Sequence, residues 1–208
     1  MASLRQTRYG ARANAAPQGA MKRIVPVLGL CGLLAFAPLP AQGADWKMDP
    51  AGSKLEFIAT FEKAAAPGEF KEFDARLRFD PDKPAGSRLE VTVKVTSADM
   101  NVADVNKEIR GKEWFDYAAF PQAEFRSTEL RRIEGNRYVA RGTLVLKGVK
   151  QPIEVPFSWT ASADGAVMEG ELLLSRGAFG IGTGEWTASD VIGADVKVKF
   201  KVKLRKAR

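Results

Sequence analysis

Apolar and polar side chains alternate along most of the chain from residue 45 onward. The last such run is the clearest, since apolar residues at every second position from Val196 to Leu204 are separated by lysines. Successive side chains of a β-strand point to opposite faces, so this run predicts a strand with one apolar and one basic face. We interpret the basic face as a solvated strand surface rather than a ligand patch. Similar alternation predicts half-buried strands over 54–61, 73–80, 89–96 and 153–160.

Turn-forming residues separate these runs at 80–86, 134–136, 147–149 and 163–165, where Gly, Pro, Asn or Asp recur. Short strands joined in this way form an antiparallel meander, and an open sheet would leave its apolar face in water and its edges unpaired. We therefore expect an all-β fold, an extended antiparallel β-barrel of about eight strands. Side chains alone can fill the interior of such a barrel, or it can hold one small ligand, and the pattern leaves both open.

One segment departs from the alternation. Over residues 101–117, Val102, Val105 and Ile109 are spaced as on one face of a helix, and Asn101 or Asp104 is available as an N-cap. We expect a short helix near 101–117, followed by an irregular turn, and this segment could form a lid over one end of the barrel.

The first 43 residues do not resemble part of a folded domain. Residues 21–43 have a basic start, an apolar run over 24–36 and small residues before Ala44, which predicts a secretory signal peptide cleaved after Gly43 or Ala44. Residues 1–20 are interpreted as a mis-assigned upstream start, with an extended basic region as the alternative. Removal of 1–43 takes five of the 32 basic residues and none of the 25 acidic ones, so the net charge falls from +7 to about +2. No nucleic-acid partner is expected.

The residue types available restrict the chemistry. The chain has no histidine, and Cys31, its one cysteine, lies in the predicted signal peptide. Ser-His-Asp triads, Cys-His pairs, histidine zinc sites and disulfides are therefore excluded from the mature chain. Carboxylate pairs such as Asp99 with Asp104, or Glu113 with Asp116, are interpreted as solvating charges. We expect no catalytic residue, no metal and no cofactor, and hence not an enzyme.

Residues 45–205 resemble the YceI-like family. The resemblance rests on motifs that occur in the family's order, the most specific being 109–116 (IRGKEWFD) with 120–125 (FPQAEF). Other matches are 46–50 with 53–57, 68–70 with 73–80, 142–152, and 175–182. Three features depart from the pattern: Gly52 stands where a histidine is usual, the paired aromatics are Trp114 and Phe115, and an added segment 183–186 is expected to reshape the barrel mouth.

The resemblance implies a periplasmic protein with a lipocalin-like barrel that holds a polyisoprenoid lipid or an isoprenoid quinone. Aromatic composition alone favours rings that simply fill a core. By the resemblance, the residues expected to line a cavity are Phe57, Phe61, Phe70, Phe79, Ile109, Trp114, Phe115, Phe125, Phe157, Trp159 and Phe179. Arg110, Lys112 and Arg176 lie in family-matching segments and are candidate head-group cations, although each could equally be a structural charge.

The expected partners are an isoprenoid lipid and, transiently, a membrane surface, with the protein a monomer or homodimer. Two alternatives stay open from the sequence. One is a filled-core barrel that acts as an interaction module in envelope stress or for a redox partner. The other is an enzyme acting on a lipid head group, with Asp99 or Glu113 as its acid.

Overall fold

A computed structural model describes residues 43–207, and within them a closed antiparallel β-barrel of eight strands. The predicted upstream start (1–20) and nearly all of the predicted signal peptide (21–43) lie outside the described residues. The barrel closes because β1 pairs with both β4 and β11. In spatial order its strands are β1 (Ala44–Met48), β4 (Phe73–Phe79), β5 (Arg88–Lys94), β7 (Gln122–Glu134), β8 (Arg137–Leu146), β9 (Val149–Ser162), β10 (Gly165–Ser175) and β11 (Asp195–Lys206).

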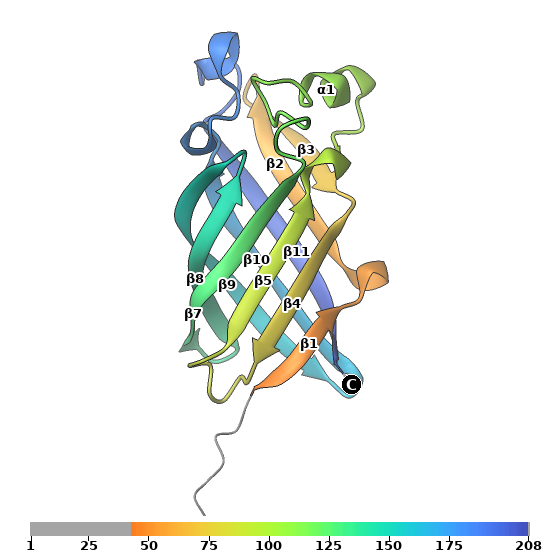
Figure 1. Ribbon diagram of the computed structural model, residues 1–208, viewed down its shortest axis with the longest axis vertical. Helices are drawn as coiled ribbons and strands as arrows, with labels where there is room; N and C mark the ends of the chain where they lie inside the picture. Colours follow the sequence, from red (N-terminus) through yellow and green to blue (C-terminus); the bar gives the residue numbers. More distant parts are fainter. Residues whose placement is uncertain (1–42, 208) are drawn as a thin grey trace, which may run out of the picture. The chain divides into compact units, whose positions relative to one another are not determined.

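Three further strands extend one side of the wall. The long strand β11 pairs with β1 near its C-terminal end, where Met48 faces Leu204, and with β2 (Lys54–Phe61) nearer its N-terminal end, where Phe57 faces Val198. Between β1 and β2 the chain makes the 3-10 turn η1 (Pro50–Gly52). Strand β3 (Ala64–Phe70) pairs with β2, and the two-residue β6 (Ala98–Asp99) pairs with β3. This extension lies beside the end of the barrel that carries α1 (Figure 1).

The alternation predicted from the sequence sets the two faces of the wall. In β11 the side chains of Val202 and Leu204 are buried, whereas Lys201, Lys203 and Arg205 between and beside them are exposed. The turn predicted at 147–149 is the β8–β9 connection, where Lys147 and Gly148 both have positive φ, as a tight hairpin turn requires. The all-β barrel expected from the sequence is confirmed.

The helix expected near 101–117 is shorter than that range. Helix α1 spans Ala103–Glu108, and hydrogen-bonded turns follow it. Neither predicted N-cap is correct, because Val102 occupies that position without a side-chain cap and Asn101 has a φ of 58°. Three 3-10 turns complete the fold: η2 (Val95–Ser97), η3 (Gly177–Phe179) and η4 (Gly184–Thr187).

The end of the barrel opposite α1 is filled by packed aromatic rings. The ring of Phe79 lies edge-on to Tyr138 at 5.0 Å and to Trp159 at 4.9 Å between centroids, and Trp46 lies edge-on to Trp159 at 5.0 Å. Phe157 stacks on Tyr138 at 5.5 Å. Such offset and edge-to-face pairs stabilise a core beyond the area they bury. This end of the barrel is therefore closed by side chains.

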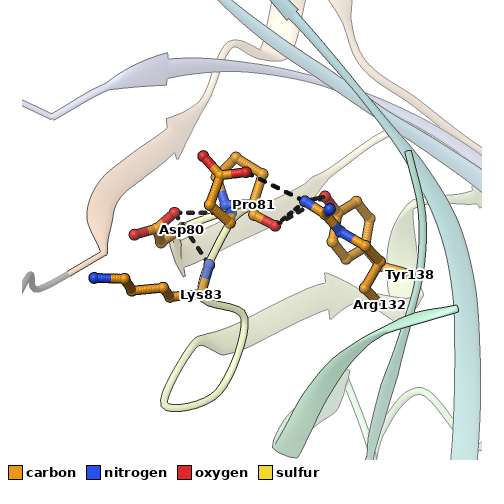
Figure 2. A network of polar contacts seen from close by, with 6 residues as sticks. Asp80, Pro81, Lys83, Arg132 and Tyr138 are labelled. Carbon is orange, nitrogen blue, oxygen red and sulfur yellow. Dashed lines mark hydrogen bonds and ion pairs between the residues drawn. The ribbon is translucent and has the colours of Figure 1, made fainter. Parts of the chain in front are cut away.

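Polar contacts fasten the β4–β5 turn over these rings. Figure 2 shows Arg132 and Tyr138 reaching the backbone carbonyl of Pro81, with the Tyr138 hydroxyl donating at 3.1 Å. The Asp80 carboxylate accepts the backbone N–H of Lys83 at 3.3 Å and stabilises the turn. The packed rings and this turn lie at one end of the barrel, and α1 lies at the other end (Figure 1).

Candidate functional site

An apolar cavity of about 710 Å³ occupies the half of the barrel nearer α1, since residues of α1 and its flanks, such as Val105 and Ile109, line it. Ligand pockets in proteins typically measure about 300–1,000 Å³. Side chains from both the barrel strands and the β2–β3 extension line it, and its innermost wall includes Phe125 and Met168, which also belong to the packed core. The polar residues that touch the cavity are Thr60, Asn101, Glu108, Ser175 and Arg176. The filled-core alternative requires side chains to fill the whole interior. The half of the barrel near α1 is not filled in this way.

Most of the aromatic residues expected at a cavity do lie on its wall. Phe57 and Phe70 pack with ring centroids 5.0 Å apart, and Phe70 lies 6.2 Å from Phe115. The predicted residues found in the lining are Phe57, Phe61, Phe70, Ile109, Trp114, Phe115, Phe125 and Phe179. Whether these residues contact a ligand stays a prediction.

Three of the expected lining residues lie elsewhere, and the expectation is corrected. Phe79, Phe157 and Trp159 belong to the aromatic core that closes the opposite end and are almost fully buried. They do face inward, as the alternation predicts. However, alternation tells which face of a strand a side chain occupies and not how far along the barrel axis it lies.

Of the two roles that the sequence left open for Arg176, the contacts favour the structural one. Its guanidinium touches the cavity but donates to six backbone carbonyls of the loop after β10, at 2.7–3.3 Å. The acceptors are Gly193, Ile181, Gly182, Trp186, Ala188 and Ile192. A guanidinium has five N–H donors, so every one is engaged. Burial lowers the pKa of Arg176, yet an arginine stays charged in a protein. Arg176 therefore stabilises the 177–193 loop, and it has no free N–H donor for a lipid head group.

Arg110 and Lys112, unlike Arg176, do not line the cavity. Both side chains are exposed, and the Arg110 Nε donates back to the carbonyl of Asn106 at 3.1 Å. No pattern in the sequence singles out Lys147, whose Nζ donates to the carbonyls of Lys112 at 2.7 Å and Gly180 at 2.6 Å. Burial lowers the pKa of Lys147. Lys147 ties the segment after α1 to the 177–193 loop.

These two segments meet at the mouth of the cavity. The backbone N–H groups of Gly182 and Thr183 donate to the Glu113 carbonyl at 2.7 and 3.0 Å. At the same place the rings of Trp114 and Trp186 approach to 5.8 Å between centroids. Both rings line the cavity, and both indole nitrogens are buried without a hydrogen-bond partner among residues 43–207. Leaving a buried donor unpaired costs roughly 1–3 kcal/mol.

A second set of contacts holds α1 at the mouth. The Asp99 carboxylate accepts from Lys71, from the Asn106 side chain at 2.7 Å and from the backbone N–H of Asn101 at 2.8 Å. These donors, Lys71 first, hold the pKa of Asp99 well below its ordinary value. The Asn106 oxygen in turn accepts the N–H of Met100 at 2.8 Å. Asp99 therefore anchors the helix and has its oxygens occupied by structural contacts.

The rim of the cavity is apolar on its outer side as well. Phe61 (47% exposed), Val102 (51%) and Val105 (37%) line the cavity and also reach solvent. Val191 is exposed beside them, since its carbonyl accepts the N–H of Glu62, next to Phe61, at 2.7 Å. Exposed apolar patches of this kind mark contact surfaces. Phe61, Val102 and Val105 therefore each present apolar surface both to the cavity and to solvent.

Within the part of the chain that the structure describes, no cluster of three or more His, Cys, Asp or Glu side chains could hold a metal ion. In the same residues, no helix has the length and apolar character needed to cross a bilayer.

Comparison with solved structures places this barrel among known folds. It is similar to BcnA of Burkholderia cenocepacia, with 33% identity, a TM-score of 0.73, and coverage of 75% of this chain and 98% of that one. It also shares its fold with a polyisoprenoid-binding domain from Saccharophagus degradans, at 16% identity and a TM-score of 0.63, covering 78% of this chain and 98% of that domain.

Sequence comparison gives the same grouping. A UPF0312 protein of Yersinia pestis is 35% identical over 142 residues, which cover 66% of this chain and 73% of that protein. A UPF0312 protein of Photorhabdus laumondii is 42% identical over 86 residues, 41% of this chain and only 44% of that relative's length. The family model described as the YceI-like domain matches residues 46–204. The chain, by this match and by its barrel, belongs to the YceI-like family.

Proposed function

We propose that this protein binds, stores or transports a long-chain polyisoprenoid lipid or an isoprenoid quinone in its barrel, and that it does so in the periplasm. The observation that carries the proposal is the apolar cavity of about 710 Å³ that opens at one end of an otherwise packed barrel. The related fold of the Saccharophagus degradans polyisoprenoid-binding domain supports the choice of ligand class. No catalytic step is part of the proposal.

The physical chemistry of a prenyl chain suits such a cavity. Burying an apolar methylene is worth about 0.8 kcal/mol, so a chain of some 40 carbons has a gross transfer free energy on the order of 30 kcal/mol. Measured affinities saturate at about 20 kcal/mol, so the cost of ordering a flexible chain must offset much of this gain. Release into water is therefore slow, and exchange takes place where the chain can enter a bilayer directly. The apolar rim around Phe61 and Val102 is suited to that contact.

The experiment is to express the full chain, purify the exported protein, and analyse it by native mass spectrometry with organic extraction. We expect one apolar adduct of prenyl-lipid mass per protein. Phe57→Lys, which places a charge on the cavity wall, should abolish the adduct. Glu56→Lys is the matched control, because Glu56 is the adjacent, outward-facing residue of β2. An adduct-free protein, or equal loading of both variants, would count against the proposal.

A further inference from the structure

We propose that Trp114 and Trp186 form a head-group subsite at the cavity mouth, and that this subsite takes a neutral oxygen acceptor, a carbonyl, ether or hydroxyl oxygen, rather than a phosphate. The inference rests on the proposed lipid-binding function and specifies which end group the lipid carries. It replaces the three cations that the sequence suggested for this role.

The first observation is a pair of unpaired donors in one place. An indole nitrogen can only donate a hydrogen bond. Buried donors without a partner are rare in folded proteins, and a buried tryptophan usually finds an acceptor for its N–H. Here two such donors have none among residues 43–207, and their rings lie 5.8 Å apart on the cavity wall. A ligand that brings an acceptor oxygen supplies what both side chains lack.

The second observation is that the backbone holding each ring is fixed. The Trp114 N–H donates to the Gly111 carbonyl at 3.1 Å, and the Trp186 carbonyl accepts from Arg176 at 2.7 Å. The contacts of Glu113 with Gly182 and Thr183 join the two segments. Both indole nitrogens are buried in this structure. Because the backbone is held in place, each ring must rotate about its side-chain bonds to present its N–H to a ligand, and the loops need not move.

The third observation is the absence of an available cation at this position in the described residues. Arg176 and Lys147 already donate to backbone carbonyls. Arg110 and Lys112, on the Trp114 segment, are exposed and do not line the cavity. The other charged residue that lines the cavity, Glu108, carries a negative charge. A phosphate would lose its hydration here without gaining a charged partner, which is costly. A neutral oxygen needs only the N–H donors.

The test compares three isoprenoids with the same chain length against the full-length protein: a prenyl quinone, a prenyl monophosphate and the unsubstituted hydrocarbon. Competition is followed by native mass spectrometry. We expect the protein to prefer the quinone over the hydrocarbon by roughly tenfold, as one or two hydrogen bonds allow, and to discriminate against the phosphate. Trp114→Phe/Trp186→Phe keeps an aromatic ring at both positions but removes both N–H donors, so it should lose the preference for the quinone over the hydrocarbon.

The control is Tyr117→Phe. The Tyr117 hydroxyl is also buried without a partner among the described residues, but Tyr117 does not line the cavity, so this variant should keep the full preference. Phosphate binding equal to quinone binding, or a double variant that retains its preference, would overturn the subsite while lipid binding stands. Failure of all three isoprenoids to bind would overturn the proposed function as well.

Discussion

At the scale of single residues, Arg176 shows how a buried charge can serve architecture. Six backbone carbonyls from one loop converge on its guanidinium, and the side chain is almost fully buried. Gly182 is required beside it, because a Cβ at that position would lie 2.1 Å from Nη1. An irregular loop cannot pair its own carbonyls as a strand does, so this one arginine pairs them instead.

The first prediction concerns Arg176→Lys. An ammonium offers three donors in place of five, so several buried carbonyls lose their partners. We expect a loss of about 2–5 kcal/mol in the free energy of unfolding, measured by urea denaturation. Arg110→Lys, at an exposed position, serves as the control and should change stability by less than about 0.5 kcal/mol. Equal stability of the two variants would contradict the structural role.

The second prediction concerns the cavity wall at Ala123, which is buried and lines the cavity. A larger side chain in a packed core lowers the free energy of unfolding by about 1–3 kcal/mol, but here the ring of Ala123→Trp can enter the cavity. We expect a folded protein that carries less than about a tenth of the normal lipid adduct, since the ring occupies the space of the chain. Gln122→Trp, on the exposed face of β7, should load normally in the same mass spectrometric assay.

At the scale of elements, the strands follow from the sequence more closely than the connections do. The alternation over 54–61 and 73–80 matches β2 and β4. The turn at Glu62 and Lys63, by contrast, carries no glycine, although both residues have positive φ. Pairing of β2 with β3 along Glu56–Phe61 stabilises this turn against its local preference. In the same way, β1 and β2 are separate strands with η1 between them, because they pair with different parts of the distant strand β11.

The third prediction concerns the attachment of α1. A carboxyl whose pKa is depressed in the folded state contributes stability above its unfolded pKa and loses it as the pH falls through the folded value. Because the pKa of Asp99 is lowered, its hold on α1 should persist through mildly acidic pH and fail only in strongly acidic solution. Asp99→Asn should loosen it at every pH above that strongly acidic range, so the amides of Met100 and Asn101 should exchange faster with solvent at neutral pH.

Hydrogen exchange followed by mass spectrometry measures this difference over residues 98–109. Asp74→Asn provides a control, because Asp74 is an exposed carboxylate on β4 whose ion pair is with Arg76 on the same strand. Unchanged exchange in Asp99→Asn at neutral pH would show that α1 is held by packing alone.

At the scale of the whole molecule, one barrel combines a packed end and a hollow end. The aromatic core around Phe79 supplies stability, which leaves the other half free to enclose a cavity. The rim of the hollow half carries most of the large exposed apolar side chains of the described residues: Phe61, Val102, Val105 and Val191. Under the proposed function, transfer through this rim onto a bilayer would keep the apolar chain of the ligand away from water.

The fourth prediction follows from that geometry. Phe61→Ser/Val102→Ser should slow the transfer of a fluorescent prenyl lipid from the protein to phospholipid vesicles roughly tenfold, because less apolar surface bridges the cavity and the bilayer. Leu173→Ser removes an apolar side chain that is 64% exposed on β10 and does not line the cavity, so it should transfer normally. Equally fast transfer by both variants would show that the apolar rim residues do not contribute to lipid release.

The sequence by itself determined the all-β class, the inward and outward faces of the strands and the family resemblance, because period-2 alternation and local motifs depend only on neighbouring residues. Only the tertiary structure decided that Phe125 lines a cavity whereas Phe157 fills a core, that Arg176 is enclosed by carbonyls, and that Trp114 meets Trp186. The physical reason is that height along the barrel and contact at its mouth depend on register and tilt between strands far apart in the chain, which no local pattern records.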